Sequence, residues 1–218
     1  MGANRPKTKN EISTKESWWI MLVKNLFAVL LLSTIIAAQA NAPRPYPIDN
    51  NHSTIGFAVS IMDGLSTVTG KFTDFTVTLT NDEKDITKSS ISVVIKAASI
   101  NTGITARDNH LRTADFFDVA TYPEITFQSR RIEKKGKQLI AVGTFTMHGV
   151  SKEIALHFTI AGTSKDSVAK KMNTGYAARI TLNRRDFGVN WRHPSVPNFV
   201  GDNVDIEINL ITKAVDVK

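Results

Sequence analysis

The chain has 218 residues, 42% of them hydrophobic, a formal net charge of +7 and no cysteine. That length and apolar fraction suit one folded domain or two small ones. The lack of cysteine excludes a disulfide scaffold, a thiol nucleophile and any metal site with cysteine ligands. Repeated apolar runs of about 20 residues are also missing, which excludes a membrane protein with several helical spans.

Residues 1–40 contain the three parts of a secretory signal peptide. Basic residues dominate residues 1–25, an uncharged apolar run follows at residues 26–38, and Ala38-Gln39-Ala40 offers a small-x-small cleavage site. A membrane anchor is the alternative, but a bilayer-spanning helix needs roughly 17–25 apolar residues and this run is shorter. We predict cleavage after Ala40, which leaves residues 41–218 as one exported domain without a membrane span.

The basic residues do not form a nucleic-acid footprint. Once the signal peptide is removed, only a mild excess of positive charge is left, so we expect no nucleic-acid partner. The densest basic stretch, residues 130–137 around Gly136, is typical of a solvated turn between two strands. Contact with an anionic membrane surface is the less favoured interpretation of that stretch.

Apolar residues recur at every second position through most of the exported chain, which is the pattern of strands with one buried and one solvated face. We expect eight strands, with apolar positions within residues 55–61, 68–79, 91–97, 125–127, 139–147, 154–160, 176–182 and 204–210. The parity changes at Thr73-Asp74, inside the second strand, which predicts a β-bulge there.

Alternation fails between the third and fourth strands, from Ile104 to Phe117. We expect one short helix in this stretch, with Thr105 and Asp108 as a capping box. Longer loops are expected at residues 163–174 and 192–203, the second of which holds two prolines.

Antiparallel strands avoid exposed edges when they close into a barrel. The fold class is therefore all-β, an eight-stranded antiparallel barrel with one short helix between strands three and four. A barrel of this size is filled by its own side chains or holds one small ligand. Several inward positions carry small residues, which favours some empty volume, although a fully packed barrel stays open: Gly70, Ala97, Ala141, Gly143 and Ala178.

Recognisable catalytic and metal-binding patterns are missing from the sequence. No two of the five histidines stand at H-x-H or H-x3-H spacing, and neither a G-x-S-x-G elbow nor a glycine-rich phosphate loop occurs. We therefore expect no catalytic residue, no metal and no cofactor, while a site assembled across strands stays open.

Two stretches are dense in polar residues, at 106–118 and 183–191, and both mix Arg and Asp with aromatic residues. They could clamp an anionic head group at the mouth of the barrel, because a guanidinium binds phosphate and carboxylate well. They could equally form internal pairs that hold loops in place, and we favour this structural interpretation.

The order of these pieces resembles the YceI-like family of lipid- or polyisoprenoid-binding proteins. The resembling segments are HSTIGFAV (52–59), STVTGKF (66–72), RDNHLRTADFFD (107–118), YPEITF (122–127), VGTFTMHGVSKEIAL (142–156), RRDFGVNW (184–191) and VGDNVDIEI (200–208). The resemblance implies a lipocalin-like barrel in the bacterial periplasm, with an apolar lumen that takes isoprenoid chains, and no catalysis. Many family members have a histidine near the end of the first strand, where this chain has Ile61-Met62, so no head-group role is carried over there.

We therefore expect a non-catalytic periplasmic protein, secreted if the source lacks an outer membrane, that carries or buffers a polyisoprenoid or another lipid. The expected lumen residues are Phe57, Val59, Phe72, Ile95, Phe127, Phe145, Phe158, Ile180 and Ile208. The expected head-group residues are Arg184, Arg185 and Arg107, the last with Asp108 as a competing partner.

Two other functions stay open. An outer-membrane barrel would show aromatic girdles, whereas the expected wet faces here carry charged residues. An enzyme on a barrel scaffold would need a catalytic constellation that the sequence does not reveal. A homodimer is also compatible with the sequence.

Overall fold

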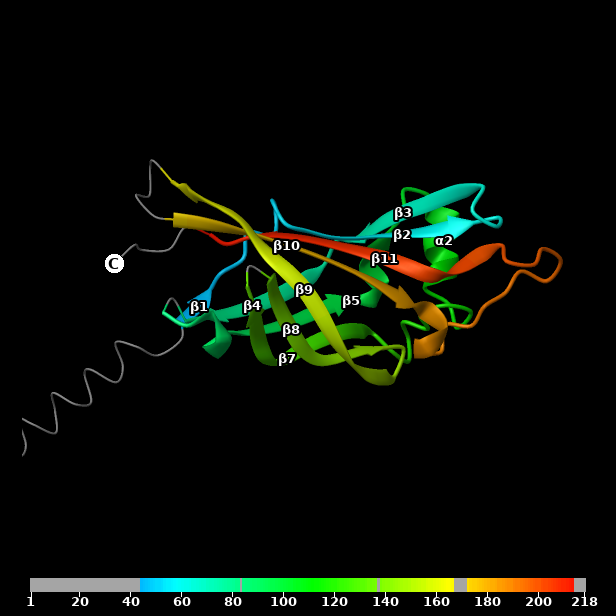
Figure 1. Cartoon of the computed structure of the whole chain (residues 1–218). Helices are drawn as coiled ribbons and strands as arrows, with labels where there is room; N and C mark the ends of the chain where they lie inside the picture. The colour runs from blue at the N-terminus through cyan, green and yellow to red at the C-terminus, as the bar shows by residue number, and fades with distance from the viewer. Residues whose placement is uncertain (1–43, 83, 137, 167–171, 214–218) are drawn as a thin grey trace, which may run out of the picture. The chain divides into compact units, whose positions relative to one another are not determined.

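The computed structural model describes residues 44–213 except Glu83, Lys137 and residues 167–171 (Figure 1). The predicted signal peptide lies outside the described residues, and its cleavage stays a prediction. Within the described residues no helix is long and apolar enough to cross a membrane.

Strands make up most of the domain. They are β1 (Arg44–Tyr46), β2 (Thr54–Ile61), β3 (Ser66–Phe72), β4 (Phe75–Asn81), β5 (Ser90–Lys96), β6 (Ile100–Asn101), β7 (Glu124–Lys135), β8 (Gln138–Met147), β9 (Val150–Lys165), β10 (Met172–Asn183) and β11 (Val200–Ile211). In the described residues the helical elements are the 3-10 turns η1 (Ile86–Lys88), η2 (Ala97–Ser99) and η3 (Arg184–Phe187) and one α-helix, α2 (Thr105–Leu111). The prediction of an all-β domain with one short helix is confirmed.

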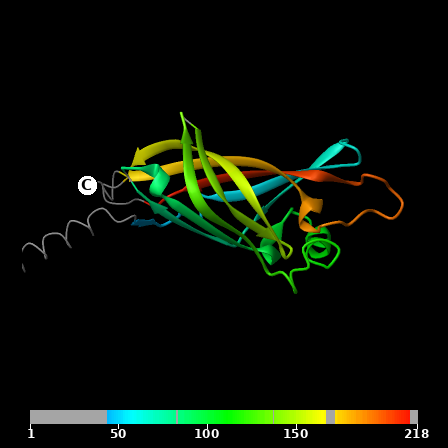
Figure 2. The same ribbon diagram turned by 60° about the horizontal axis from the view of Figure 1, so that its bottom comes forward.

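The strands form one antiparallel sheet that curls into a barrel (Figures 1 and 2). The order is β1-β4-β5-β7-β8-β9-β10-β11-β2-β3-β6, and the chain itself joins the two ends, because β3 leads into β4 and β5 leads into β6. Main-chain hydrogen bonds continue across the junction, from Lys96 to Asp74 at 3.0 Å and from Thr73 to Ser99 at 3.2 Å. The sheet therefore closes around an interior.

The prediction of eight strands is corrected to eleven in the described residues. Thr73 and Asp74 do not form a bulge but separate two strands, of which β3 pairs with β2 and β6 while β4 pairs with β1 and β5. Likewise η2 divides the expected third strand from β6. These two neighbouring breaks let the strands turn the corner that closure of the sheet requires. The short β1 lies outside the predicted set.

The short helix lies where it was predicted, but the predicted capping box is wrong. Asp108 does not serve the helix start at Thr105: its Oδ1 accepts hydrogen bonds from the main-chain nitrogen of Thr102 at 2.9 Å and from the hydroxyl of Thr102. The reason is geometric, since side chains in a helix lean toward its N-terminus and Asp108 thereby reaches the segment that precedes the helix.

The expected loops at 163–174 and 192–203 are also shorter than predicted. Strand β9 runs to Lys165, β10 starts at Met172 and pairs with it, and β11 starts at Val200. Residues 161–165 are exposed on both faces, so this part of the ladder has no buried face and shows no apolar alternation. The basic turn at Gly136 does join two strands, as predicted.

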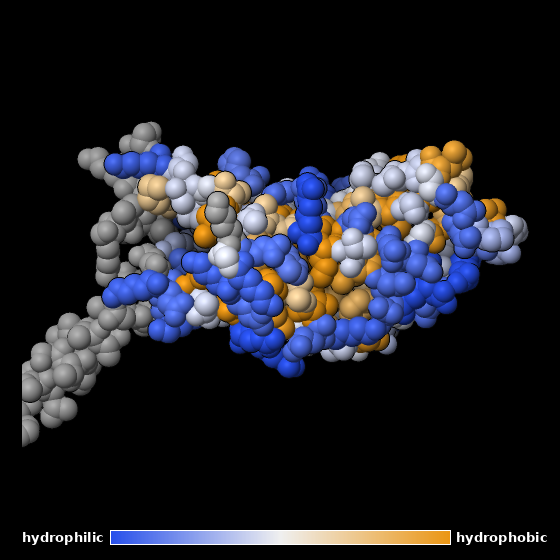
Figure 3. Space-filling model, viewed as in Figure 1, coloured by the Kyte–Doolittle hydropathy of each residue, from blue (hydrophilic) through white to orange (hydrophobic). Residues whose placement is uncertain are grey.

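Inward side chains from the strands form one apolar core. On the face shown in Figure 3, hydrophilic residues surround a strip of hydrophobic residues in the middle of the domain. Gly143 in β8 shows how closely the strands approach: a Cβ atom there would lie 2.3 Å from the carbonyl oxygen of Gln128 in β7. The register of β7 and β8 shifts at the neighbouring residues Ser129 and Arg131. The inward surface of β8 is therefore interrupted at Gly143, where no side chain fills the lumen.

Candidate functional site

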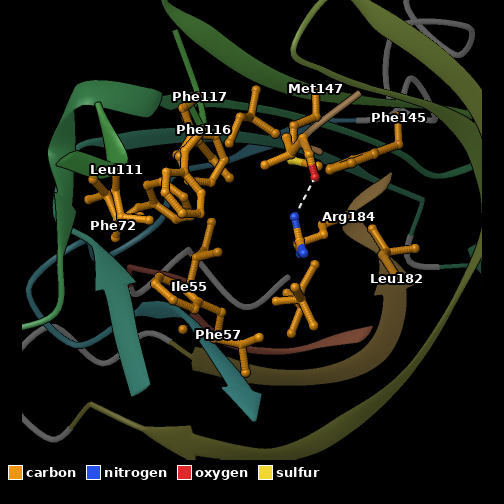
Figure 4. Close-up of a pocket in the computed structure, with 18 of the residues that line it drawn as sticks. Ile55, Phe57, Phe72, Leu111, Phe116, Phe117, Phe145, Met147, Leu182 and Arg184 are labelled. Carbon is orange, nitrogen blue, oxygen red and sulfur yellow. Dashed lines mark hydrogen bonds between the residues drawn. The ribbon is translucent and has the colours of Figure 1, made fainter. Parts of the chain in front are cut away.

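One end of the barrel interior holds an apolar cavity beside α2, here named the α2 cavity (Figure 4). Its empty volume, including its opening, is ≈ 860 Å³. Every lining side chain except that of Arg184 is apolar: Ile55, Gly56, Phe57, Val59, Phe72, Ile95, Ile100, Leu111, Phe116, Phe117, Ile125, Phe145, Met147, Leu182, Arg184, Val189, Val200, Val204 and Ile206. A cavity with this lining suits an apolar small molecule or chain.

Part of the wall of the α2 cavity comes from outside the sheet. Leu111 ends α2, and Phe116 and Phe117 follow in the next turn, where Phe117 meets Phe72 edge to face at 6.1 Å (Figure 4). Arg112 fastens this segment to the barrel, because its guanidinium donates to the main-chain oxygens of Ala98 at 2.7 Å and Ile100 at 2.8 Å. Arg112 thus fixes the wall.

Asp108 is a second anchor of the same segment and is only 7% exposed. Burial opposes its ionisation, but the hydrogen bonds from Thr102, followed by the charges of Arg112 and Arg107, outweigh that effect and hold the pKa of Asp108 below its ordinary value. The carboxylate is therefore charged at neutral pH and ties α2 to the segment before it.

Arg184, at the start of η3, is the one charged residue among the described residues that line the α2 cavity. Its Nε donates to the carbonyl of Gly201 at 3.0 Å, and Nη1 donates to the carbonyls of Val189 at 2.7 Å and Trp191 at 3.2 Å. Nη2 donates to the carbonyl of Val200 at 3.3 Å and to a carboxylate oxygen of Asp202 at 3.0 Å. A guanidinium has five N–H groups, so all of them are already engaged. Burial lowers the pKa of Arg184, and the charge of Asp202 opposes that shift.

The other two predicted head-group residues lie outside the lining of the cavity. Arg107 donates to the hydroxyl of Thr102 at 2.7 Å and to its carbonyl at 2.9 Å, so it faces the segment before α2 rather than its neighbour Asp108. Nη1 of Arg185 lies 3.5 Å from a carboxylate oxygen of Asp202, and Arg185 is an exposed residue. Their role toward a ligand stays a prediction.

The two polar stretches of the sequence meet in space through their aromatic rings. Trp191 packs against His110 with ring centres 5.3 Å apart and against Phe116 at 5.1 Å. This contact joins the α2 segment to the chain that leaves η3. Both stretches therefore build one cap at this end of the barrel.

The opposite end of the interior holds a second apolar cavity, here named the η1 cavity. Its empty volume, including its opening, is ≈ 720 Å³, and Ile55 lines both cavities. It is lined by Ile55, Val77, Leu79, Ile86, Ser89, Ser90, Ile91, Val93, Ile132, Ala141, Leu156, Phe158, Tyr176, Ala177, Ala178, Ile208 and Leu210. Burial raises the pKa of the Tyr176 phenol, and nearby Tyr46 adds to the shift.

A model of the YceI-like domain matches residues 46–212, nearly all of the described chain. This chain belongs to the YceI-like family. Protein YceI of Escherichia coli O6:H1 is 33% identical over 168 residues, which cover 76% of this chain and 87% of the relative. The YceI protein of Campylobacter jejuni superposes with a TM-score of 0.60 at 30% identity, covering 69% of this chain and 88% of that one. The resemblance inferred from the sequence motifs is confirmed.

Two more distant structures support the YceI-like fold alone. BcnA of Burkholderia cenocepacia has a TM-score of 0.68 at 22% identity and covers 76% of this chain and 99% of its own. A polyisoprenoid binding domain from Saccharophagus degradans has a TM-score of 0.57 at 18% identity and covers 78% of this chain and 98% of its own. The barrel is therefore shared well beyond close sequence similarity.

In the YceI-like barrel the nine predicted lumen residues fall into three groups: those that line the α2 cavity, those that line the η1 cavity and those that line neither. Phe57, Val59, Phe72, Ile95 and Phe145 line the α2 cavity, and Phe158 and Ile208 line the η1 cavity. Phe127 and Ile180 line neither, although Phe127 belongs to the core and Ile180 is packed against it. Whether these residues contact a ligand stays a prediction.

Sequence analysis missed the aromatic wall contributed by the α2 segment. Phe116 and Phe117 lie outside any alternating stretch, in the predicted helical segment and its polar cluster, and neither is among the predicted lumen residues. An adjacent aromatic pair in the polar segment after the helix is the signal that could have identified them.

Among the described residues, no group of three His, Asp or Glu side chains could hold a metal ion.

Proposed function

We propose that this chain is an exported, non-catalytic carrier or buffer that binds a long-chain apolar or amphipathic ligand, a polyisoprenoid or another lipid, in the α2 cavity. The observation that carries the proposal is the lining of that cavity, which is apolar except for Arg184. The polyisoprenoid binding domain with a similar fold is consistent with it.

Burial of the chain supplies the binding energy in this proposal. Each methylene moved from water into an apolar cavity contributes ~0.8 kcal/mol, so a ligand with a long chain binds tightly without many polar contacts. Apolar cavities also tend to stay dry, so the ligand does not have to displace ordered water when it binds.

The test is native mass spectrometry of the protein purified from its own periplasm, with organic extraction of what co-purifies. We expect an added mass that disappears on extraction and returns on incubation with a prenol. The variant Ile206→Asp, which places a carboxylate in the α2 cavity, should lose the added mass, while Thr159→Asp on the exposed face of β9 should keep it. Failure of the wild-type protein to take up any prenol would contradict the proposal.

A head group, in this proposal, is contacted by Arg185 rather than by Arg184 or Arg107. The N–H groups of Arg184 are all engaged, and Arg107 is directed at Thr102. The side chain of Arg185 is partly exposed, and among the described residues it is paired with Asp202 at 3.5 Å. Arg185→Ala should weaken binding of a prenyl phosphate by roughly 1.5–3 kcal/mol and leave binding of the uncharged prenol of the same length unchanged. Equal loss for both ligands would contradict a head-group role.

Export is the remaining part of the proposal and rests on residues 1–40. Mass analysis of the mature protein should give Asn41 as its first residue. An intact N-terminus in the membrane fraction would favour the anchor instead.

A further inference from the structure

The two cavities lie one after the other along the barrel, and the strands show what separates them. On β10 the inward residues follow one another at every second position: Leu182 lines the α2 cavity, Ala178 lines the η1 cavity, and Ile180 between them lines neither. Ile180 is packed against the core. A side chain at this level therefore occupies the interior where the lumen would otherwise be continuous.

Strand β7 repeats this arrangement. Ile125 lines the α2 cavity and Ile132 lines the η1 cavity, while Phe127 lies between them, lines neither and is only 5% exposed. Phe127 is paired in register with Val93 of β5 and Phe145 of β8, which belong to different cavities. Its ring thus lies at the boundary between the two cavities.

The neighbouring strands complete the same level. On β8, Phe145 lines one cavity and Ala141 the other, and Gly143 between them has no side chain. Gly143 is paired with Ile154 of β9, which is packed against the core and lines neither cavity. The main chain of β7 lies close against Gly143, and on the other side Ile154 fills the interior between the two cavities.

We propose that Phe127, Ile154 and Ile180 form a partition across the lumen that limits how much of an apolar chain this protein can bury. This inference rests on the proposed function, and it means that the α2 cavity selects its ligand by chain length. A chain that enters the α2 cavity gains from each added methylene until its end meets the partition. Further methylenes stay outside the cavity or must displace the Phe127 ring.

The test is a titration of the full exported chain with straight-chain alcohols of increasing length, from hexanol to hexadecanol. In the wild-type protein, affinity should rise about fourfold with each buried methylene and then level off at a limiting length. In Phe127→Leu and in Ile180→Ala, the partition has an opening into the η1 cavity, so affinity should continue to rise beyond the wild-type limit.

The matched control is Phe158→Leu, the same substitution at a residue that lines the η1 cavity behind the partition. It should leave the limiting length unchanged, and melting curves of all variants verify that each is folded. The partition would be overturned, with lipid binding left intact, by a wild-type affinity that rises without a limit. It would also be overturned if both partition variants kept the limiting chain length of the wild type. Absence of binding at every chain length would overturn the proposed function together with the partition.

Discussion

The two ends of the barrel interior are built by different means. The wall of the α2 cavity includes a helix, the turn after it and η3, and these segments are held by the buried charges Asp108 and Arg184. The wall of the η1 cavity comes from strands and the η1 turn, and none of the described residues that line it is charged. One end therefore depends on hydrogen bonds to buried charges, and the other depends on packing between strands. The same apolar lumen can thus be disturbed in two distinct ways.

The largest effect is expected from a charge placed at the packed end. Ile208→Asp removes an apolar side chain from the η1 cavity and leaves a carboxylate without a partner, so the free energy of unfolding should fall by about 4 kcal/mol or more. Urea unfolding measures the change. The same charge on the outer face of β9, in Thr159→Asp, should cost less than about 0.5 kcal/mol. Equal stability of the two variants would mean that the inward face is assigned wrongly.

Arg184→Ala tests the charge-dependent end. The substitution leaves the carbonyls of Gly201, Val189, Trp191 and Val200 without their donor, which should lower the free energy of unfolding by about 3 kcal/mol. The neighbouring Arg185→Ala removes an exposed ion pair with Asp202 and should cost less than about 1 kcal/mol. If both variants unfolded at the same urea concentration, the cap would not depend on Arg184.

The contrast between the two ends also explains what the sequence could and could not predict. Strand positions such as Ile180 and Ile208 follow an alternation that local chemistry imposes, so their inward direction could be predicted. The partners of Arg184 could not, because four of its five acceptors are main-chain carbonyls and every residue has one. The separation of β3 from β4 was visible only as a change of parity, since a bulge and a strand break give the same pattern.

A substitution at the level between the two ends tests how closely the strands must approach. Gly143→Ala places a Cβ atom 2.3 Å from the main-chain oxygen of Gln128, and main chain cannot move aside easily. We expect a loss of about 2 kcal/mol in the free energy of unfolding. Gly162→Ala is the matched control, because no atom lies within 4 Å of the Cβ position there. Similar melting temperatures for the two variants would show that β7 and β8 can separate at this level without cost.

The smallest effect is expected at Asp108, and its pH dependence distinguishes a charged anchor from a merely polar one. Asp108→Asn keeps an oxygen that can accept from Thr102 but removes the charge, so stability at neutral pH should fall by about 1.5 kcal/mol. Because the folded-state pKa of Asp108 lies below its ordinary value of 3.8, the contribution of its charge is complete above that pH and is lost as pH falls through the folded-state pKa. The difference between wild type and variant in urea unfolding should therefore stay constant from neutral pH to about pH 4 and shrink below it. A difference that persists unchanged in acid would mean that the geometry of the hydrogen bonds, and not the charge of the carboxylate, holds the α2 segment against the barrel.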